Sequence, residues 1–306
     1  MISVLPKSEH EYEAAISFGG GVYSAISDEV SGLVWTDSQN VEALASTLEA
    51  HPSISWVQLP FAGTDNFVPL FQELLAKGRT VSFTSAKGAY REPVAEHALM
   101  LSLALARALP ERLAAKSWGR KFAASMYDAN VLILGGGGIA GELVRLLTPF
   151  RAKISLVRRE PRHMDGVELV TSLADLDELL PRADFVFSCS ALTEETRGIF
   201  NEKRFKLMKK SAYFINVARG AVVITADLED ALRSGEIAGA GLDVTDPEPL
   251  PIGHPLWEAP NIIITPHTAD TPEMCIRLLS ARIVENVTNL IGDLPLIGQV
   301  NLKLGY

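Results

Sequence analysis

Four consecutive glycines, Gly135 to Gly138, constrain the fold of this chain more than any other feature. They follow the apolar run VLIL at 131–134 and precede the helix-like stretch IAGELVRLL, so they join a predicted strand to a predicted helix. Backbone can approach a ligand closely only where side chains are absent, and the free N–H groups of a helix start attract phosphate. The turn therefore predicts a dinucleotide-binding βα unit.

The register of this turn follows from where the strand stops. Because the apolar run ends at Leu134, we place the first glycine of the fingerprint at Gly135, the second at Gly137 and the small third residue at Ala140. Gly138 and Ile139 complete the expected pyrophosphate contacts. A register on 136, 138 and 141 also fits the spacing, and the competing interpretation is an ordinary glycine-rich turn.

Apolar runs alternate with helix-like stretches along the chain, which predicts parallel sheets covered by helices. The strand candidates are ISVLP, VYSAIS, GLVWTD, SWVQLP and TVSFT, then VLIL, ISLV, FVFS, YFINV, AGLDV and NIIIT. We expect an α/β protein with two doubly wound parallel-sheet domains. A Rossmann NAD(P)-binding domain over 99–269 is inserted in a flavodoxin-like substrate-binding domain of 1–98 plus 270–306. The segment 91–118 between the two series is apolar nearly all round, which predicts one long buried helix.

Composition narrows the class of protein. Of the 306 residues, 47% are hydrophobic and 21% are charged, which is typical of a globular protein. The net charge of −9 argues against a nucleic-acid surface. Cys189 and Cys275 are too few for a disulfide framework and lack metal-ligand spacing, so we expect no metal and a reducing compartment. No secretory signal or membrane-spanning run is visible, so we expect a cytoplasmic protein without a membrane partner.

The tip of the second strand of the βα unit indicates which nicotinamide cofactor is used. NAD-binding versions carry an acidic residue about 20 positions after the glycines, whereas this chain has Arg158 and Arg159. A guanidinium offers a 2′-phosphate charge-assisted hydrogen bonds, so NADP(H) is preferred. NAD(H) remains the alternative, because Glu160 could turn inward and the arginines could simply lie in a solvated loop.

Three later stretches place ionisable side chains after predicted strands, where open parallel sheets bind ligands. They are NVARG at 216–220, GLDVTDPEPLP at 241–251 and TPH at 265–267. With VAEH at 94–97, LTEETRG at 192–198 and HPLW at 254–257, they resemble the D-isomer-specific 2-hydroxyacid dehydrogenases over nearly the whole chain. Each residue alone has an ordinary structural explanation; the set carries the resemblance.

The resemblance implies roles for individual residues. His267 would be the proton donor, Glu248 would hold its imidazole, and Arg219 would bind the carboxylate and carbonyl of the substrate. Further cofactor contacts would come from Ser190, Val217, Ala218, Arg219, Asp243 and His267. Phe61, Ala62 and Gly63 match the loop that receives the substrate carboxylate. The chain departs from the family pattern at the acidic cofactor position, at Ala140 and in the TAD stretch after His267.

The same resemblance favours NADPH-dependent reduction of a small 2-oxo acid of the glyoxylate or hydroxypyruvate type. The alternatives are an enzyme like 3-phosphoglycerate dehydrogenase and a non-catalytic NAD(P)-sensing protein of corepressor type. We expect a homodimer, because the apolar helix from Val94 to Leu109 would otherwise expose too much surface. His97 and His254 are interpreted as structural, and Cys189 as inert core.

Overall fold

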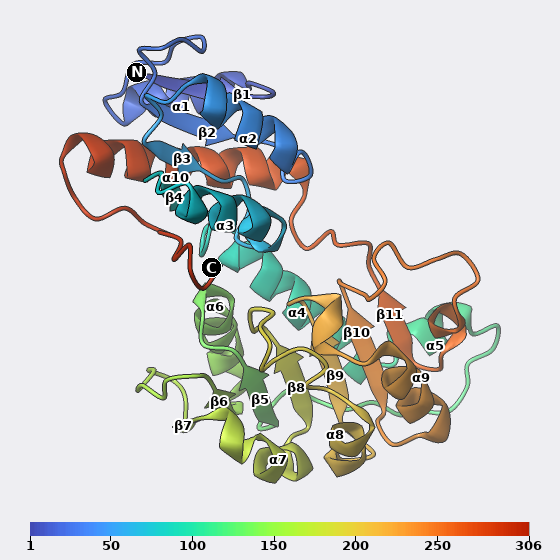
Figure 1. The fold of residues 1–306 in the computed structure, drawn as a ribbon. Helices are drawn as coiled ribbons and strands as arrows, with labels where there is room; N and C mark the ends of the chain where they lie inside the picture. Colours follow the sequence, from blue (N-terminus) through green and yellow to red (C-terminus); the bar gives the residue numbers. More distant parts are fainter. Residues whose placement is uncertain (306) are drawn as a thin grey trace. The chain divides into compact units, whose positions relative to one another are not determined.

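The computed structural model describes residues 1–305 and divides the chain into two compact units. One unit comprises Met1–Tyr90 and the residues from Thr271 onward; the other is Arg91–Asp270. Residues 91–98 thus belong to the second unit rather than to the first, because helix α4 runs without a break from Arg91. The predicted fold class, α/β with two parallel sheets, is confirmed (Figure 1).

The second unit is built on a seven-stranded parallel sheet in the order β11-β10-β9-β8-β5-β6-β7. Its strands are β5 (Asn130–Leu134), β6 (Lys153–Val157), β7 (Leu169–Thr171), β8 (Phe185–Ser188), β9 (Tyr213–Asn216), β10 (Gly239–Leu242) and β11 (Ile262–Ile264). From β5 the chain proceeds to one edge through β6 and β7, then returns to β8 and proceeds to the other edge. The order therefore reverses between β5 and β8, the position at which such sheets bind ligands.

Helices cover both faces of this sheet. They are α4 (Arg91–Ala106), α5 (Leu109–Ala114), α6 (Gly138–Leu147), α7 (Leu176–Leu179), α8 (Glu202–Leu207) and α9 (Thr225–Ser234), with 3-10 turns η2 (Thr148–Phe150), η3 (Leu173–Asp175), η4 (Leu180–Arg182), η5 (Gly220–Val222) and η6 (Pro255–Glu258). Helices α7, α8 and α9 share one apolar cluster with alternate residues of the strands. Helices α4 and α6 pack together, and α4 lies on β9, β10 and β11. Gly239 and Gly241 leave the space that Leu101 and Leu105 of α4 occupy.

The first unit holds a four-stranded parallel sheet in the order β1-β2-β3-β4. Its elements are β1 (Ile2–Leu5), α1 (His10–Phe18), β2 (Gly32–Trp35), α2 (Val41–Ala50), β3 (Trp56–Gln58), η1 (Asp65–Phe67), α3 (Val68–Ala76), β4 (Ser82–Thr84) and α10 (Pro272–Ile291). Helices α2 and α3 form one apolar cluster with the strands, and α1 packs against α10. The predicted return of the carboxyl-terminal tail to this unit is observed, since Val300 N donates to Phe83 O at 2.9 Å.

Two predicted elements differ in the structure. The run VYSAIS forms no strand, but Tyr23 makes a single parallel bridge to Ile2 on the side of β1 away from β2. The bridge corresponds to the outer position of a flavodoxin-like 2-1-3-4-5 order. The predicted long helix over 91–118 breaks at Ala108, which has a left-handed φ of 52°, and α5 then ends at Ala114. Leu109 and Pro110 begin a second helix, so apolar periodicity alone overstated the length of the first.

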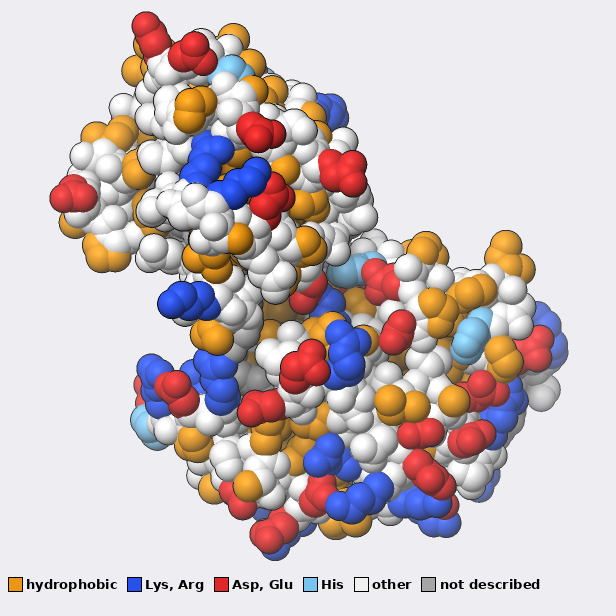
Figure 2. Space-filling view, in the orientation of Figure 1, with side chains coloured by type: hydrophobic (Ala, Val, Ile, Leu, Met, Phe, Trp, Pro, Cys, Tyr) orange, Lys and Arg blue, Asp and Glu red, His pale blue; other side chains and the backbone are white. Residues whose placement is uncertain are grey.

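Within residues 1–305, no helix has the length and apolar character needed to cross a bilayer. In the same residues, no group of three or more His, Cys, Asp or Glu side chains is arranged to hold a metal ion. On the surface drawn in Figure 2, acidic and basic side chains are intermixed, so this view shows no extended patch of one sign.

Candidate active site

The strand ends of the second unit form one level row. Val157, Leu134, Ser188, Asn216, Leu242 and Ile264 pair with their neighbours across six adjacent strands. The ladder continues one residue further, through the hydrogen bonds of Gly135 N to Val157 O, Cys189 N to Leu134 O, Val217 N to Ser188 O, Asp243 N to Asn216 O and Thr265 N to Leu242 O. Six strands span roughly 24 Å at about 4.8 Å spacing. Every site residue predicted in this unit, apart from Ile139, Ala140 and Glu248, lies within four residues of this row.

The glycine turn has the geometry that a dinucleotide requires. Gly135 has a φ of +111°, and a Cβ there would lie 2.6 Å from the carbonyl of Cys189, so only glycine fits. A Cβ at Gly137 would meet nothing within 4 Å, which leaves space beside the first N–H groups of α6. Ala140 is fully buried. These three observations favour the register on 135, 137 and 140, with Gly138 and Ile139 in the first turn of the helix.

The guanidinium of Arg158 lies against the glycine turn. A Cβ at Gly136 would stand 2.8 Å from Arg158 Nε and 3.0 Å from its Cζ. The backbone of Arg158 is fixed by its N–H, which donates to Thr171 O of β7 at 2.9 Å. Arg159 is exposed. Glu160 is also exposed and is ion-paired with Arg162, so it does not turn toward the glycines.

The structure brings His267 and Glu248 together. Nδ1 of His267 lies 2.6 Å from Glu248 Oε1, and Thr245 N donates to Glu248 Oε2 at 3.3 Å. The hydrogen bond to Glu248 raises the pKa of His267 against the opposing effect of burial, and the same bond lowers the pKa of Glu248. Because a carboxylate only accepts, the imidazole carries its proton on Nδ1 and leaves Nε2 for another partner. Their side chains are 46% and 40% exposed, so the pair is accessible.

Arg219 lies on the same edge, in the turn after β9. Asn216 Nδ2 donates to Arg219 O at 3.0 Å, and Ala218 N donates to Asn216 Oδ1 at 3.1 Å, so the asparagine folds the chain back on itself. The charge of Arg219 adds to the lowering of the pKa of Glu248 and opposes the raised pKa of His267. Val217 and Ala218 are buried, so any contact of theirs with a ligand would have to be made by backbone.

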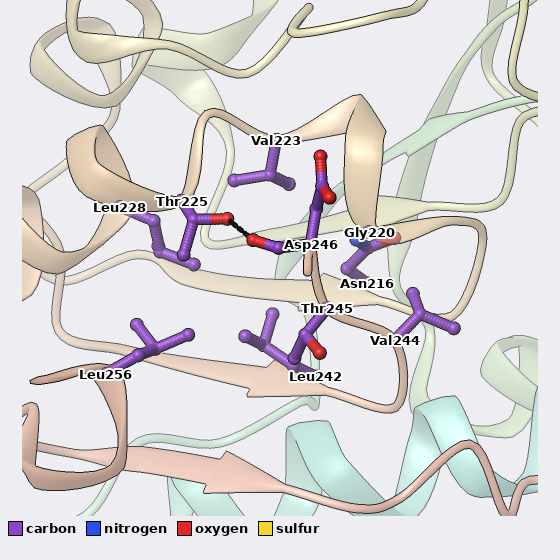
Figure 3. A pocket seen from close by; sticks show the side chains of 10 residues that line it. All are labelled: Asn216, Gly220, Val223, Thr225, Leu228, Leu242, Val244, Thr245, Asp246 and Leu256. Atoms are coloured by element: carbon purple, nitrogen blue, oxygen red, sulfur yellow. Dashed lines mark hydrogen bonds between the residues drawn. The ribbon is translucent and has the colours of Figure 1, made fainter. Parts of the chain in front are cut away.

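The Arg219 turn packs directly on the segment that leads to Glu248. Asn216 and Gly220 line a small pocket with Thr245 and Asp246 (Figure 3). Thr225 Oγ1 donates to Asp246 O across this contact at 2.5 Å. The Arg219 turn and the segment that leads to Glu248 therefore lie in direct contact.

Asp243 anchors the loop that carries His267. Its carboxylate is 2% exposed and accepts from Thr265 Oγ1 at 2.6 Å, Thr268 N at 2.9 Å and Ala269 N at 3.1 Å. Its backbone carbonyl accepts His267 N at 2.8 Å. His267 has a φ of 51°, a left-handed conformation that costs a residue other than glycine roughly 1–3 kcal/mol. The bonds to Asp243 on both sides of His267 hold it in that conformation.

Two further groups lie at this edge. Ser190 Oγ, beside the Gly135 turn, is buried and without a hydrogen-bond partner among the described residues, which suits a ligand contact. His97 of α4 lies within hydrogen-bonding distance of Thr265, a placement that sequence reasoning missed because a helix position gives no signal of it. His254 Nδ1 accepts from Leu256 N at 3.1 Å and so caps η6. Cys189 is only partly buried as a residue, but burial of its thiol raises the pKa of that group to about 12, so the thiol stays protonated.

The predicted substrate loop belongs to the first unit and follows β3. Ala86 N donates to Phe61 O at 3.0 Å, and Tyr90 Oη donates to Pro60 O at 2.6 Å, so this backbone is held from two sides. Phe61 and Ala62 are exposed. The loop therefore presents main chain that small side chains leave accessible.

Comparison with known proteins identifies the class. Residues 98–269 match the family described as D-isomer specific 2-hydroxyacid dehydrogenase, NAD binding domain. The match covers more than half of the chain, and it coincides with the unit that holds the glycine turn and the His267–Glu248 pair. The chain belongs to this family and is an NAD(P)-dependent 2-hydroxyacid dehydrogenase, so the resemblance inferred from the motifs is confirmed.

Individual relatives agree with this assignment. The human protein named glyoxylate reductase/hydroxypyruvate reductase is 30% identical over 97% of this chain and 88% of its own length. A D-isomer specific 2-hydroxyacid dehydrogenase from Xanthobacter autotrophicus, solved with NADPH and MES, superposes with a TM-score of 0.83 at 27% identity, covering 100% and 99% of the two chains. An NADPH-dependent glyoxylate/hydroxypyruvate reductase from Sinorhizobium meliloti, solved with NADP and sulfate, gives a TM-score of 0.80 at 27% identity with the same coverage.

Proposed function

We propose that this chain reduces a small 2-oxo acid of the glyoxylate or hydroxypyruvate type to the D-2-hydroxy acid, with NADPH as the preferred reductant. The observation that carries the proposal is the His267–Glu248 pair, joined by a 2.6 Å contact at the strand edge of the NAD(P)-binding unit. Two solved relatives contain NADPH or NADP, and the human relative is named for both substrates.

Each residue of the site is assigned one part of the reaction. NADPH, when bound, supplies the hydride that attacks the carbonyl carbon. Arg219 binds the carboxylate of the substrate and stabilises the negative charge that develops on the carbonyl oxygen. His267 donates its Nε2 proton to that oxygen, and Glu248 keeps the imidazole charged and oriented until it does. In the direction of oxidation, neutral His267 accepts the proton of the hydroxyl group.

The pyrophosphate of the cofactor is assigned to Gly135, Gly137, Gly138, Ile139 and Ala140, and the 2′-phosphate to Arg158 with Arg159. Ser190, Val217 and Ala218 line the path to the nicotinamide, with Asp243 behind the His267 loop. The open space at Gly137 and the unpartnered hydroxyl of Ser190 fit such a ligand. Phe61, Ala62 and Gly63 are assigned to the substrate carboxylate.

Replacing Arg158 with aspartate is expected to shift selectivity toward NADH. The change exchanges an attractive partner of the 2′-phosphate for a repulsive one, so the ratio of kcat/KM for NADPH to that for NADH should fall by roughly 10- to 100-fold, as for the loss of one charge-assisted hydrogen bond. Steady-state kinetics with both cofactors measure this ratio. Arg162→Asp makes the same charge change four residues further on, beside Glu160, and should leave selectivity unchanged. An unaltered ratio in Arg158→Asp would refute the assignment.

Replacing Glu248 with glutamine is expected to shift the pH dependence of reduction to lower pH. The carboxylate raises the pKa of His267, so its removal lets that pKa fall. Reduction needs the charged imidazole, which the variant loses at a lower pH than the wild type does. The falling limb of kcat/KM against pH should therefore move to lower pH. At low pH, where His267 is charged in both the wild type and Glu248→Gln, the two values of kcat/KM should converge. If the falling limb of Glu248→Gln coincides with that of the wild type, Glu248 does not set the pKa of His267.

NADPH oxidation with a panel of small 2-oxo acids tests the proposed function. Turnover of glyoxylate and hydroxypyruvate supports it, whereas preference for phosphohydroxypyruvate supports an enzyme like 3-phosphoglycerate dehydrogenase. Tight NADPH binding without turnover of any 2-oxo acid supports a cofactor sensor of corepressor type.

The oligomeric state needs a different argument from the one that the sequence offered. Most of α4 is buried within its own unit, so α4 does not expose the apolar surface on which the dimer prediction was based. Exposed apolar side chains lie instead in the segment after α4, where Leu113 is 74% and Trp118 is 93% exposed. We retain the homodimer on this basis.

A further inference from the structure

His97, on helix α4, contacts the group that anchors the catalytic loop. Its Nε2 lies 2.8 Å from Thr265 Oγ1 and 3.4 Å from Asp243 Oδ1. The imidazole is 14% exposed, so water screens these contacts only weakly. Thr265 Oγ1 is in turn 2.6 Å from the same carboxylate oxygen. Three polar groups, one on α4 and two that directly follow β10 and β11, therefore meet at one point.

The positions of the protons follow from the chemistry of these groups. The Asp243 carboxylate is an acceptor only, and the hydroxyl of Thr265 has a single proton. The contact of 2.6 Å to Oδ1 is the shortest that this hydroxyl makes, whereas Leu242 O lies at 3.4 Å, so the proton is donated to Asp243. Thr265 Oγ1 must then accept from His97. Nε2 of His97 consequently carries a hydrogen, whatever the state of Nδ1.

The same carboxylate holds the backbone on the far side of His267. Thr268 N and Ala269 N donate to its two oxygens, and Thr265 precedes His267 by two residues. A shift of Asp243 or Thr265 would therefore release the loop on both sides of the left-handed His267. His97 is the only one of the three polar groups that comes from outside the two strands that carry this loop.

We infer that His97 is a positioning residue for His267. It donates a hydrogen bond to Thr265 and supports Asp243, and through them it fixes the turn from Pro266 to Ala269 in the conformation that presents the catalytic imidazole. This inference rests on the proposed function and adds a residue of α4 to the machinery. It also accounts for a partly buried histidine near a buried carboxylate, since the hydroxyl of Thr265 gives both of them a polar partner.

A pair of substitutions at position 97 tests the inference. Glutamine carries an amide nitrogen the same number of bonds from Cβ as the imidazole Nε2, so His97→Gln keeps a donor toward Thr265, whereas His97→Leu removes it. We expect His97→Leu to lower kcat on the order of 10- to 100-fold through misplacement of His267. The KM for the 2-oxo acid and the Kd for NADPH should change less than about threefold, and His97→Gln should restore kcat to within about threefold of the wild type.

Hydrogen exchange of the purified full-length protein gives a second readout that does not depend on turnover. The peptide spanning 265–270 should exchange faster in His97→Leu than in the wild type and in His97→Gln, while strand β5 remains protected in all three. If the wild type reduces no 2-oxo acid, the proposed function fails, yet the exchange of 265–270 still decides the positioning role.

Two results would overturn the inference. One is unchanged kcat together with unchanged exchange in His97→Leu. The other is a loss of kcat that glutamine does not restore and that accompanies faster exchange in β5, because His97 would then serve general packing.

Discussion

Alanine in place of His267 is expected to lower kcat for reduction on the order of 10²- to 10⁴-fold, the usual contribution of a general acid. The Glu248 carboxylate favours the charged form of this imidazole, since it raises the pKa of His267. Most of the affinity for NADPH should persist, because the groups assigned to its phosphates, the glycine turn and Arg158, are separate from His267. Single-turnover kinetics and fluorescence titration of NADPH separate the two quantities.

The backbone at His267 calls for a second variant. Its φ of 51° is unfavourable for alanine, so His267→Ala could lose activity through the loop rather than through the acid. Asparagine adopts this left-handed conformation far more readily and lacks the imidazole, so His267→Asn separates the two effects. Both variants should be equally inactive. His254→Ala, which removes a helix-capping histidine of the same unit, should retain kcat. Activity within about tenfold of wild type in His267→Asn would reject the acid role.

The sequence was sufficient to place those candidate site residues that directly follow a strand. Six predicted strands of the second unit are present, and their carboxyl ends align in one row. Period and spacing locate the end of a strand, and a parallel sheet places all such ends on one edge, so Arg219, Asp243 and His267 could be assigned to that edge from the sequence alone. Glu248 could not be placed by this argument, since it lies in a loop and reaches His267 only through the course of that loop.

Other features depend on contacts that no local pattern encodes. Strand β7 is three half-exposed residues and lacks an apolar run. The end of α4 lies just before the left-handed Ala108, where the one local sign is Pro110 in the first turn of α5. His97 faces Thr265 because α4 packs on β10 and β11, and a helix position carries no sign of which strand it will meet. These are consequences of tertiary packing, which overrides local propensity.

Gly220 is expected to tolerate no side chain, and its replacement should have the largest effect on stability. A Cβ at this position would lie 1.9 Å from Thr245 O and 2.6 Å from Asp246 N. These are backbone atoms, so no side chain can move aside, and the Arg219 turn would have to separate from the segment leading to Glu248. We expect Gly220→Ala to cost at least about 3 kcal/mol, above the usual range for overpacking. That corresponds to a fall in Tm of roughly 6 °C or more.

Gly141 provides the control for this prediction. At Gly141, inside α6, a Cβ would meet nothing within 4 Å, so Gly141→Ala should raise stability by about 0.4–1 kcal/mol. The same variant bears on the cofactor, since tight NADPH binding in Gly141→Ala is expected only if the fingerprint lies on 135, 137 and 140. Where Gly220→Ala still folds, Arg219 and Glu248 should no longer be held together, and kcat/KM should fall together with Tm. Calorimetry and steady-state kinetics on the two variants decide the matter: a Gly220→Ala protein with wild-type Tm would mean that the two segments are not in backbone contact.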